Sequence, residues 1–265
     1  MFKIYDKITQ KERFFHIAFY PDDLNSAAES CIIDVSNIFI SGGLHHGIQR
    51  LLPCMGSVNR RTEKKLSEHI ICRTAKKGDV IHSGDSDCLG LLLIRKGQLR
   101  AFILSDEGRE ITIYRLLDMD ICLFSASCMM HSIQFEITIE AEKDTDFWII
   151  PADVYKEIMA QSAPLANYTN EIMAARFSEV MWLIEQILWK SFDKRLARFL
   201  LDESSLEGSN ILSITHETIG NHLGSAREVV TRMLRYFQNE GIVKLSRGKI
   251  EILSPEKLES LCSDL

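Results

Sequence analysis

The strongest pattern in the sequence runs from Thr215 to Gln238 and reads THETIGNHLGSAREVVTRMLRYFQ. Thr215 is a good helix N-cap, and Gly224 suits a sharp turn because a positive φ angle costs glycine nothing. Gly220 lies where the first helix would be crossed by the next, so a side chain there would push the two helices apart. This joint spacing predicts a helix-turn-helix with helices at 216–223 and 226–238.

The second predicted helix has an outward face suited to DNA. An arginine can donate two parallel hydrogen bonds to guanine, and a glutamate can accept one from cytosine. We expect the side chains that reach base edges to be Arg227, Glu228, Thr231 and Arg232. Arg235, on the same side, is expected to contact the DNA backbone.

Two simpler roles exist for the same residues. Ser225 can cap the second helix, and Ser225 with Glu228 also forms the pattern of a capping box. Glu228 and Arg232 are spaced as an i, i+4 ion pair, worth only about 0.3–0.5 kcal/mol when exposed. These roles do not exclude DNA binding, and we also expect Ser225 to lie against the DNA backbone.

The charge distribution supports a nucleic-acid partner although the whole chain is acidic. The net charge of the chain is −6, whereas residues 225–249 alone have a net charge of +4. Two short strands, 242–245 and 249–253, flank Arg247 and predict a wing beside the helices. Arg247 at its tip is expected to contact a DNA phosphate, although a solvated turn arginine is an equally simple interpretation.

Upstream, residues 74–150 read as an antiparallel β-roll. Short apolar runs alternate with glycine turns, a texture typical of barrels and sandwiches. The predicted strands are 79–82, 89–95, 99–104, 110–116, 135–141 and 147–150. The interior of such a roll could hold a ligand or be filled by its own side chains.

A long helix is predicted between these two parts, beginning after Pro164. Apolar residues follow each other at alternating spacings of three and four, which is typical of a dimer seam. The seam residues are Met173, Phe177, Val180, Ile184 and Ile187. The alternative is a helix packed only on its own β-roll. Trp182 and Trp189, off the seam, are expected to pack within the chain.

Length, composition and motifs argue against a membrane protein, a secreted disulfide-rich protein and an enzyme. The chain has 265 residues, which at roughly 100–200 residues per domain allows two domains. Neither a membrane span nor a secretory signal is evident, so we expect a cytoplasmic protein without a membrane partner. Seven cysteines without C-x-x-C spacing are a poor disulfide framework and a poor metal site. We identify no catalytic motif and expect neither an enzyme nor a metal site.

With a β-roll, a long helix and a winged helix-turn-helix in this order, the sequence resembles the Crp/Fnr family of bacterial transcription regulators. The resemblance covers roughly residues 48–265 and is strongest in 214–241, then in the β-roll run from Lys77-Gly78-Asp79 to Gly108. It implies an α+β fold: an N-terminal antiparallel β-roll like a cyclic-nucleotide-binding jelly roll, a dimerisation helix and a C-terminal winged helix-turn-helix. The expected limits are 1–47 for an extension of unassigned role, then 48–161, 162–191 and 192–265.

The family resemblance also implies roles for individual residues. Arg227, Glu228 and Arg232 match base-reading positions, and Thr231 matches a position that tunes half-site choice. Thr215 and His216 match positions that contact the DNA backbone. A palindromic site with a TGA-type half-site core is implied, read by a homodimer. For such a regulator we also expect RNA polymerase as a partner.

The sensor part departs from the family pattern. Members that bind cyclic AMP have an arginine in the phosphate cassette, whereas the corresponding stretch here, 120–131, has none, so cyclic AMP is disfavoured. The cysteine gaps from 54 to 72 and from 72 to 88 do not fit the spacings of an iron–sulfur site, which disfavours that cofactor. No cofactor is identified. The candidate effector or redox residues are Cys122, Ser125, Ser127 and Cys128, although two buried, inert cysteines are the simpler interpretation.

The sequence therefore predicts a homodimeric DNA-binding regulator whose β-roll senses a small molecule or redox signal. One alternative is a ligand-binding regulatory module that acts through a protein partner without reading DNA. A second is a cupin-type enzyme, which would need several histidines inside the roll, where the sequence offers only His82 and His131.

Overall fold

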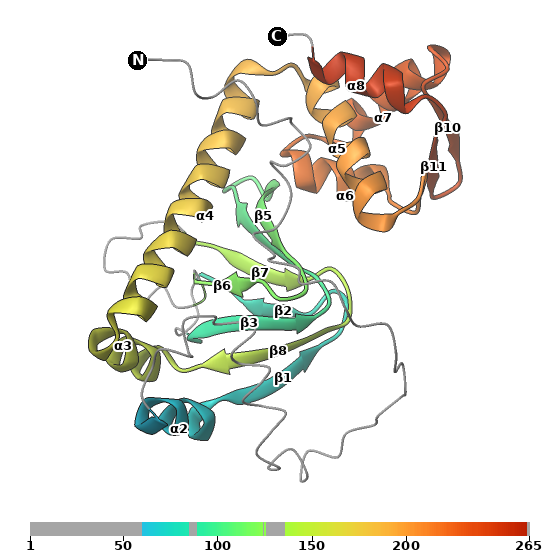
Figure 1. The fold of residues 1–265 in the computed structure, drawn as a ribbon. Helices are drawn as coiled ribbons and strands as arrows, with labels where there is room; N and C mark the ends of the chain where they lie inside the picture. The colour runs from blue at the N-terminus through green and yellow to red at the C-terminus, as the bar shows by residue number, and fades with distance from the viewer. Residues whose placement is uncertain (1–59, 85–88, 124, 126–135, 264–265) are drawn as a thin grey trace, which may run out of the picture. The chain divides into compact units, whose positions relative to one another are not determined.

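The computed structural model describes residues 60–84, 89–123, 125 and 136–263 (Figure 1). The predicted extension at 1–47 and the candidate residues Ser127 and Cys128 lie outside these ranges. Within them the predicted fold class is confirmed, because a β-roll, a long helix and a winged helix-turn-helix follow each other along the chain. None of the helices in the described ranges is long and apolar enough to cross a lipid bilayer.

The β-roll consists of two four-stranded antiparallel sheets. The first, in the order β1-β8-β3-β6, contains β1 (Ile71–Ala75), β8 (Thr145–Ile150), β3 (Leu91–Lys96) and β6 (Ile121–Cys122). The second, in the order β2-β7-β4-β5, contains β2 (Val80–His82), β7 (Thr138–Ala141), β4 (Leu99–Leu104) and β5 (Glu110–Leu116). Strands far apart in sequence are therefore neighbours in both sheets.

Apolar side chains of both sheets form the core of the roll. Leu92 of the first sheet and Leu99 and Ile139 of the second belong to one cluster and are fully buried. The opposite face of the first sheet is covered by helices, so residues 91–94 of β3 are buried on both faces. This double burial explains why β3 reads as a continuous apolar run without polar alternation.

Three helices contribute to the cluster on that outer face: α2 (Arg60–His69), α3 (Ala152–Gln161) and α4 (Ala163–Trp189). The fully buried Tyr155 of α3 donates to or accepts from Thr169 of α4, with 2.7 Å between the two hydroxyl oxygens. The Ser162 hydroxyl accepts from the Leu165 amide at the start of α4. The first turns of α4 are thereby fixed on the roll.

Helix α4 is 27 residues long, and beyond its first turns it presents an apolar face to solvent. Phe177 is 67% exposed, and the seam residues Ile184 and Ile187 are also exposed. The prediction that Trp189 packs within the chain is wrong, because its side chain is 78% exposed. Trp189 occupies the last position of α4, where no other element of the described chain covers it.

The C-terminal part is a winged helix-turn-helix around a core of its own. Its helices are α5 (Phe192–Glu207), α6 (His216–Leu223), α7 (Arg227–Asn239) and α8 (Pro255–Ser263). A three-stranded sheet in the order β10-β11-β9 forms the wing from β9 (Ile211–Leu212), β10 (Val243–Ser246) and β11 (Lys249–Ile252). Leu200, Ile219 and Phe237 are fully buried in the shared core.

Several elements were not predicted from the sequence, among them α2, α3, α8, β1 and β6. Strand β1 has the exposure pattern of an edge strand, with only Ala75 buried, so it lacks the apolar alternation on which the prediction relied. Strand β6 is two residues long, too short for any periodic signal. Pairing with β8 and β3 forms these strands, and that pairing is a tertiary effect.

Candidate nucleic-acid interface

The turn between α6 and α7 depends on two glycines. A Cβ atom at Gly220 would lie 2.5 Å from the Ser225 carbonyl oxygen, closer than real Cβ atoms come. Gly224 ends α6 in the left-handed conformation with φ of 63°. Both roles predicted for these glycines are confirmed, and together they fix the approach of the two helices.

Further hydrogen bonds hold the start and end of α6. The Thr215 hydroxyl accepts from the Thr218 amide over 3.0 Å, so the predicted N-cap is confirmed. At the other end, Arg195 of α5 donates to the Leu223 carbonyl oxygen over 3.1 Å. A carbonyl that the helix itself leaves unpaired is thereby satisfied by α5.

The predicted helix cap at Ser225 is wrong. Helix α7 begins at Arg227, its N-cap residue is Ala226, and no side chain forms a cap hydrogen bond there. The Ser225 carbonyl lies at the crossing with Gly220, so the chain has not yet entered the helix at this residue. The capping box with Glu228 is excluded for the same reason, and Ser225 is left half-buried beside the turn.

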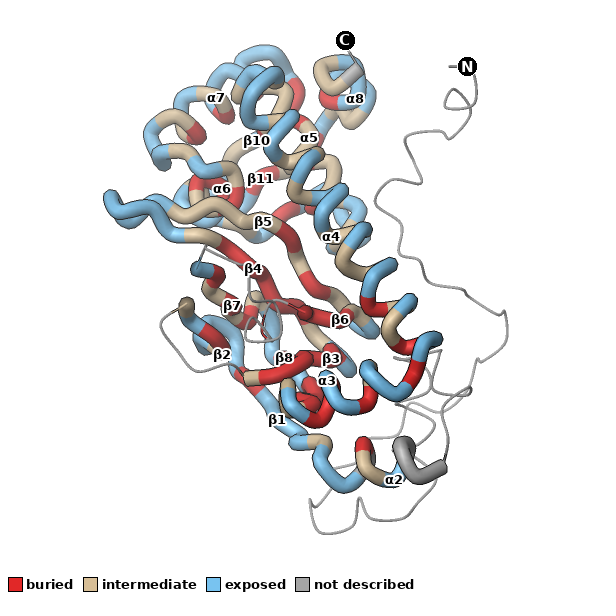
Figure 2. The backbone as a smooth tube through the Cα atoms, turned by 90° about the vertical axis from the view of Figure 1, so that its left-hand side faces the viewer, coloured by how far each residue is buried: buried red, intermediate tan, exposed pale blue. Residues whose placement is uncertain are grey.

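Most outward residues of α7 are exposed, and Thr231 among them is half-buried (Figure 2). A shallow concave surface on this face is lined by Arg227, Glu228, Thr231, Arg232, Arg235, Tyr236 and Asn239. The inward residues Val230, Leu234 and Phe237 are buried in the core. The charged side chains of α7 lie on the opposite side of the helix. The structure thus brings the five predicted DNA-contacting residues of this helix onto one accessible surface.

Thr231 differs from its neighbours because its hydroxyl is already engaged. It donates to the Arg227 carbonyl oxygen over 2.8 Å and lies 2.9 Å from His216 Nδ1. Since its single proton goes to Arg227, the His216 ring must donate through Nδ1. Burial and the nearby Arg227 and Arg235 charges lower the pKa of His216, so the ring is neutral near pH 7.

Glu228 and Arg232 do not form the i, i+4 pair that their spacing allows. Within residues 136–263 neither side chain has an ion-pair partner, and both are exposed. Their polar groups are therefore available to a ligand on the outside of α7. At the wing, Ser246 pairs with Lys249 across a two-residue turn, and Arg247 is exposed at its tip.

The candidate sensor residues lie inside the roll. Cys122 of β6 is fully buried, with its sulfur 3.4 Å from the Tyr114 hydroxyl. The buried Ser125 donates to the carbonyl oxygens of Gly90 and Cys122. Both residues have the contacts of well-packed structural positions. Cys128 cannot be placed beside Cys122, since it lies outside the described residues.

Sequence reasoning missed a half-buried arginine on α4. The guanidinium of Arg176 lies 4.8 Å from the centre of the Tyr114 ring, donates to Glu179 over 2.7 Å and is 3.8 Å from Asp120. Its side chain is only 13% exposed. The available signal was a charged residue next to the seam position Phe177, flanked by apolar turns of α4.

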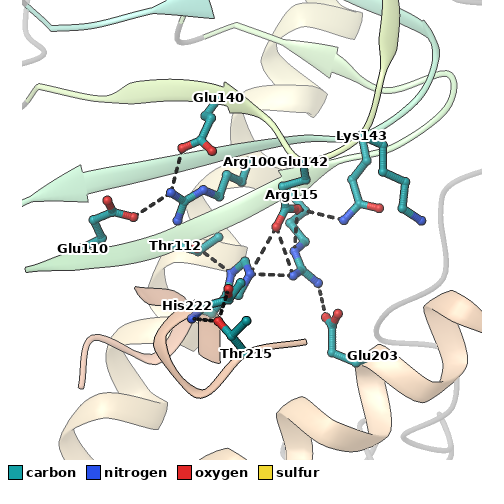
Figure 3. Close-up of polar contacts among 12 residues, drawn as sticks. Arg100, Glu110, Thr112, Arg115, Glu140, Glu142, Lys143, Glu203, Thr215 and His222 are labelled. Atoms are coloured by element: carbon teal, nitrogen blue, oxygen red, sulfur yellow. Dashed lines mark hydrogen bonds and ion pairs between the residues drawn. The ribbon is translucent and has the colours of Figure 1, made fainter. Parts of the chain in front are cut away.

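A second missed group links the β-roll to the winged helix (Figure 3). Arg115 of β5 forms ion pairs with Glu142, which follows β7, and with Glu203 of α5. His222 of α6 lies against the same arginine, with 2.9 Å between Nε2 and an Arg115 terminal nitrogen. Nothing in the local sequence of these four residues indicates that they meet.

Comparisons with known proteins agree with this geometry. A family model described as a Crp-like helix-turn-helix domain matches residues 194–261, and one described as a cyclic nucleotide-binding domain matches residues 72–162. The transcriptional activator protein Anr of Pseudomonas protegens is 26% identical over 197 residues, which are 71% of this chain and 79% of Anr. The fumarate and nitrate reduction regulatory protein of Yersinia pestis is 26% identical over 200 residues, 71% of this chain and 77% of its own length.

Solved structures give the same result. One crystal structure is of a protein from Eubacterium rectale ATCC 33656 that is assigned to the crp/fnr family of transcriptional regulators. Its sequence is 67% identical to this chain, and the two structures superpose with a TM-score of 0.78 over 80% of this chain and 98% of the other. FixK2 from Bradyrhizobium japonicum superposes with a TM-score of 0.60 over 74% of this chain and 98% of its own. FixK2 is only 18% identical, so that likeness shows the fold alone.

Proposed function

This chain belongs to the Crp/Fnr family of transcriptional regulators and is therefore a DNA-binding regulator rather than an enzyme. We propose that it binds a palindromic DNA site as a homodimer, under the control of a small-molecule or redox signal. The proposal divides the chain as the sequence predicts: an extension at 1–47, a sensor at 48–161, a dimerisation helix at 162–191 and a DNA-binding domain at 192–265.

The observation that carries this proposal is the exposed polar face of α7 above an apolar inner face. A helix of this kind fits the major groove, with the side chains near its N-terminus at the base edges. Arg227 and Arg232 would read guanines, and Glu228 would accept from a cytosine, in a half-site with a TGA-type core. Since the Thr231 hydroxyl is engaged, this residue would offer its methyl group to a thymine methyl.

The DNA backbone would lie along the edges of the same surface. Thr215 and His216 stand at the N-terminus of α6, where the helix dipole favours a phosphate. Ser225 lies beside the turn, Arg235 lies one helical turn beyond Arg232, and Arg247 projects at the wing tip. These contacts would supply the salt-dependent part of the affinity.

Dimerisation is typical of the family, and we propose that the exposed face of α4 is the dimer seam. Phe177, Ile184 and Ile187 are exposed in the single chain, and Val180 is half-buried on the same face. Met173, the first seam residue, also packs against the cluster under the roll. A parallel partner helix would bury this apolar face.

The signal is proposed to act in the β-roll, and cyclic AMP fits it poorly. In the described part of the predicted cassette, residues 120–123 and 125, no side chain is cationic. The nearby arginine of α4, Arg176, is already held by Glu179 and Asp120. Cys122 and Ser125 would respond only to a signal that rearranges their packing, and their redox role would also require Cys128. We identify no cofactor for the chain, and an iron–sulfur cluster stays disfavoured by the cysteine spacing.

We propose that the DNA-bound dimer contacts RNA polymerase, since a transcription regulator must affect that enzyme. We also propose that the protein works in the cytoplasm, where the DNA of its bacterial relatives lies.

Selection of bound sites from random duplexes tests the proposed function. We expect the selected sites to be palindromic, with half-sites about one DNA turn apart, and their affinity to fall steeply with added salt. Selection of no common sequence, together with capture of a protein partner by the intact chain, would favour the regulatory module that does not read DNA.

A further inference from the structure

We infer that a partly buried cluster of four residues, Arg115, Glu142, Glu203 and His222, docks the winged helix on the β-roll and thereby presents α7 to DNA. We call it the docking cluster. Only its effect on DNA binding rests on the proposed function, since docking itself can be measured without DNA.

The docking cluster joins β5, α5, α6 and the turn between β7 and β8 through one arginine (Figure 3). The Arg115 guanidinium donates to Glu203 on α5, and its Nη2 donates to Glu142 Oε1 over 3.2 Å. The Arg115 Nε lies 2.9 Å from Glu142 Oε2, but its N–H does not point at that oxygen, so this contact is an ion pair without a hydrogen bond. One side chain of β5 thus binds carboxylates from both the roll and the winged helix.

His222 completes the cluster from α6. Its Nδ1 lies 2.9 Å from the Thr112 hydroxyl, and its Nε2 lies 2.9 Å from Arg115 and 3.1 Å from Glu142. Burial lowers the pKa of His222, so the ring is neutral near pH 7. Because a hydroxyl can donate or accept, either neutral tautomer leaves both ring nitrogens with a partner.

A β-bulge places Thr112 and Arg115 on the same side of β5. Residues three apart on a regular strand point to opposite faces. In β5 the register shifts: Tyr114 pairs with Ala101 and Thr112 with Phe102, so Ile113 is the extra residue. Bulges commonly re-aim side chains in this way. Here the bulge lets both residues reach His222.

Contacts around the docking cluster extend the same interface. Lys143 of the roll pairs with Glu207 of α5 over 2.8 Å in a more exposed position. Ile111 of β5 packs against the helix-turn-helix turn, since a Cβ at Gly224 would lie 3.0 Å from its Cδ1. The turn that orients α7 is therefore in direct contact with the sensor sheet.

Burial makes the docking cluster sensitive to the loss of any member. The side chains of Arg115, Glu142, Glu203 and His222 are 19%, 14%, 10% and 4% exposed. Removing Arg115 would leave two largely buried carboxylates without their cation, and removing Glu203 would leave the winged helix without a carboxylate for Arg115. In this inference docking is an equilibrium between an engaged and a released state, and a ligand that binds one of the two states better would bias it.

The docked arrangement leaves the concave outward surface of α7, which we call the reading surface, open to a ligand. Arg227, Glu228 and Arg232 remain exposed while α6 is held against β5. Holding the winged helix in one orientation reduces the conformational freedom that would otherwise be lost on binding DNA. Tyr114, between Thr112 and Arg115 on β5, contacts Cys122 and Arg176. The same strand therefore touches both the interior of the sensor and the docking cluster.

Two matched substitutions in the full chain test this inference. Arg115 pairs with two carboxylates, and Glu203→Gln removes the one that lies across the interface. Glu140→Gln is the control, because it removes one of the two carboxylates of Arg100, and both of these, Glu110 and Glu140, belong to the roll. Hydrogen exchange of the α6 amides is measured without DNA, with circular dichroism to verify folding. We expect Glu203→Gln to speed α6 exchange about tenfold and Glu140→Gln to leave it unchanged.

DNA affinity is the second readout. We expect Glu203→Gln to weaken binding to a selected duplex about threefold or more, and Glu140→Gln to have no effect. Equal α6 exchange in both variants would overturn the docking role, and tighter DNA binding by Glu203→Gln would overturn the presenting role. If Glu203→Gln does not fold, His222→Gln replaces it, with the same expected outcomes. Failure of the wild-type chain to bind any duplex would refute the proposed function, whereas the exchange experiment would still decide docking.

Discussion

Arg115 and Glu203 lie 88 residues apart in the sequence and form a partly buried ion pair between β5 and α5. The pair connects the sheet that contains Tyr114 with the helix that precedes the helix-turn-helix. The β-roll and the DNA-binding elements are therefore joined by a route of contacts through this pair, in addition to the long helix α4. Both routes meet the same strand, because Arg176 of α4 packs on Tyr114.

Replacing Arg232 with alanine tests direct reading of the DNA sequence. Arg232 is exposed on α7 and has no protein partner among residues 136–263, so the substitution removes nothing from the fold. We expect a loss of about 1–3 kcal/mol in specific binding and relaxed discrimination at one base pair. Titration against duplexes varied at each position measures both effects.

Arg247→Ala is the matched control, since this wing-tip arginine is expected to contact phosphate. It should weaken binding by a similar factor on every duplex and reduce the salt dependence. The same uniform loss for Arg232→Ala would mean that Arg232 is also a phosphate contact.

Replacing Ile184 with lysine tests the dimer seam. Ile184 is 40% exposed on α4, so a lysine there is tolerated by the single chain but places a charge inside a helix–helix interface. We expect monomers in sedimentation and weak binding to a single half-site. Leu104→Lys, at an exposed position of β4, should leave the dimer intact. An unchanged dimer with lysine at 184 would move the interface elsewhere.

Replacing Gly220 with alanine tests the crossing of α6 and α7. The new Cβ would lie 2.5 Å from the Ser225 carbonyl oxygen, which is backbone and has little room to move. We expect the free energy of unfolding to fall by about 1–3 kcal/mol in urea denaturation. Helix propensity alone would favour alanine by about 1 kcal/mol, so a more stable variant would show that the helices separate freely.

The ionisable groups at the docking cluster predict a loss of stability in acid. Burial raises the pKa of Glu142, but the hydrogen bond with His222 and the Arg115 charge outweigh it and lower this pKa from 4.5 to about 2. Between these values the unfolded chain takes up a proton that the folded chain does not, so stability falls as the pH falls. The lowered pKa of His222 has the same sign below its ordinary value of 6.5.

Asp202 changes the pH dependence of stability in the opposite direction, so its contribution has to be separated from that of Glu142. Burial raises its pKa from 3.8 to about 6, so the folded chain holds an extra proton between these values and gains stability as the pH falls through them. Unfolding in urea from pH 7 to pH 3 should therefore be measured in an Asp202→Asn background. There, Glu142→Gln should flatten the pH dependence below pH 4.5; an unchanged slope would show that Glu142 titrates normally.

Local sequence determined much of this protein. The spacing of Thr215, Gly220 and Gly224 predicted α6 and the turn, because capping and positive φ angles depend only on a few neighbouring residues. The alternation of apolar residues predicted β4 and β5 with the bounds observed. The charges on the outside of α7 followed from helical periodicity.

Tertiary structure alone decided the rest. The failed cap at Ser225 depends on how α6 crosses α7, and the exposure of Trp189 depends on what packs near the end of α4. The docking cluster combines residues up to 107 positions apart, and a β-bulge brings one of them, Arg115, onto the same side of β5 as Thr112. A single glutamate or histidine in the sequence does not indicate burial, since that depends on the surfaces that folding brings against it. For this reason the reading surface could be predicted from its own helix, whereas the contacts that orient it could not.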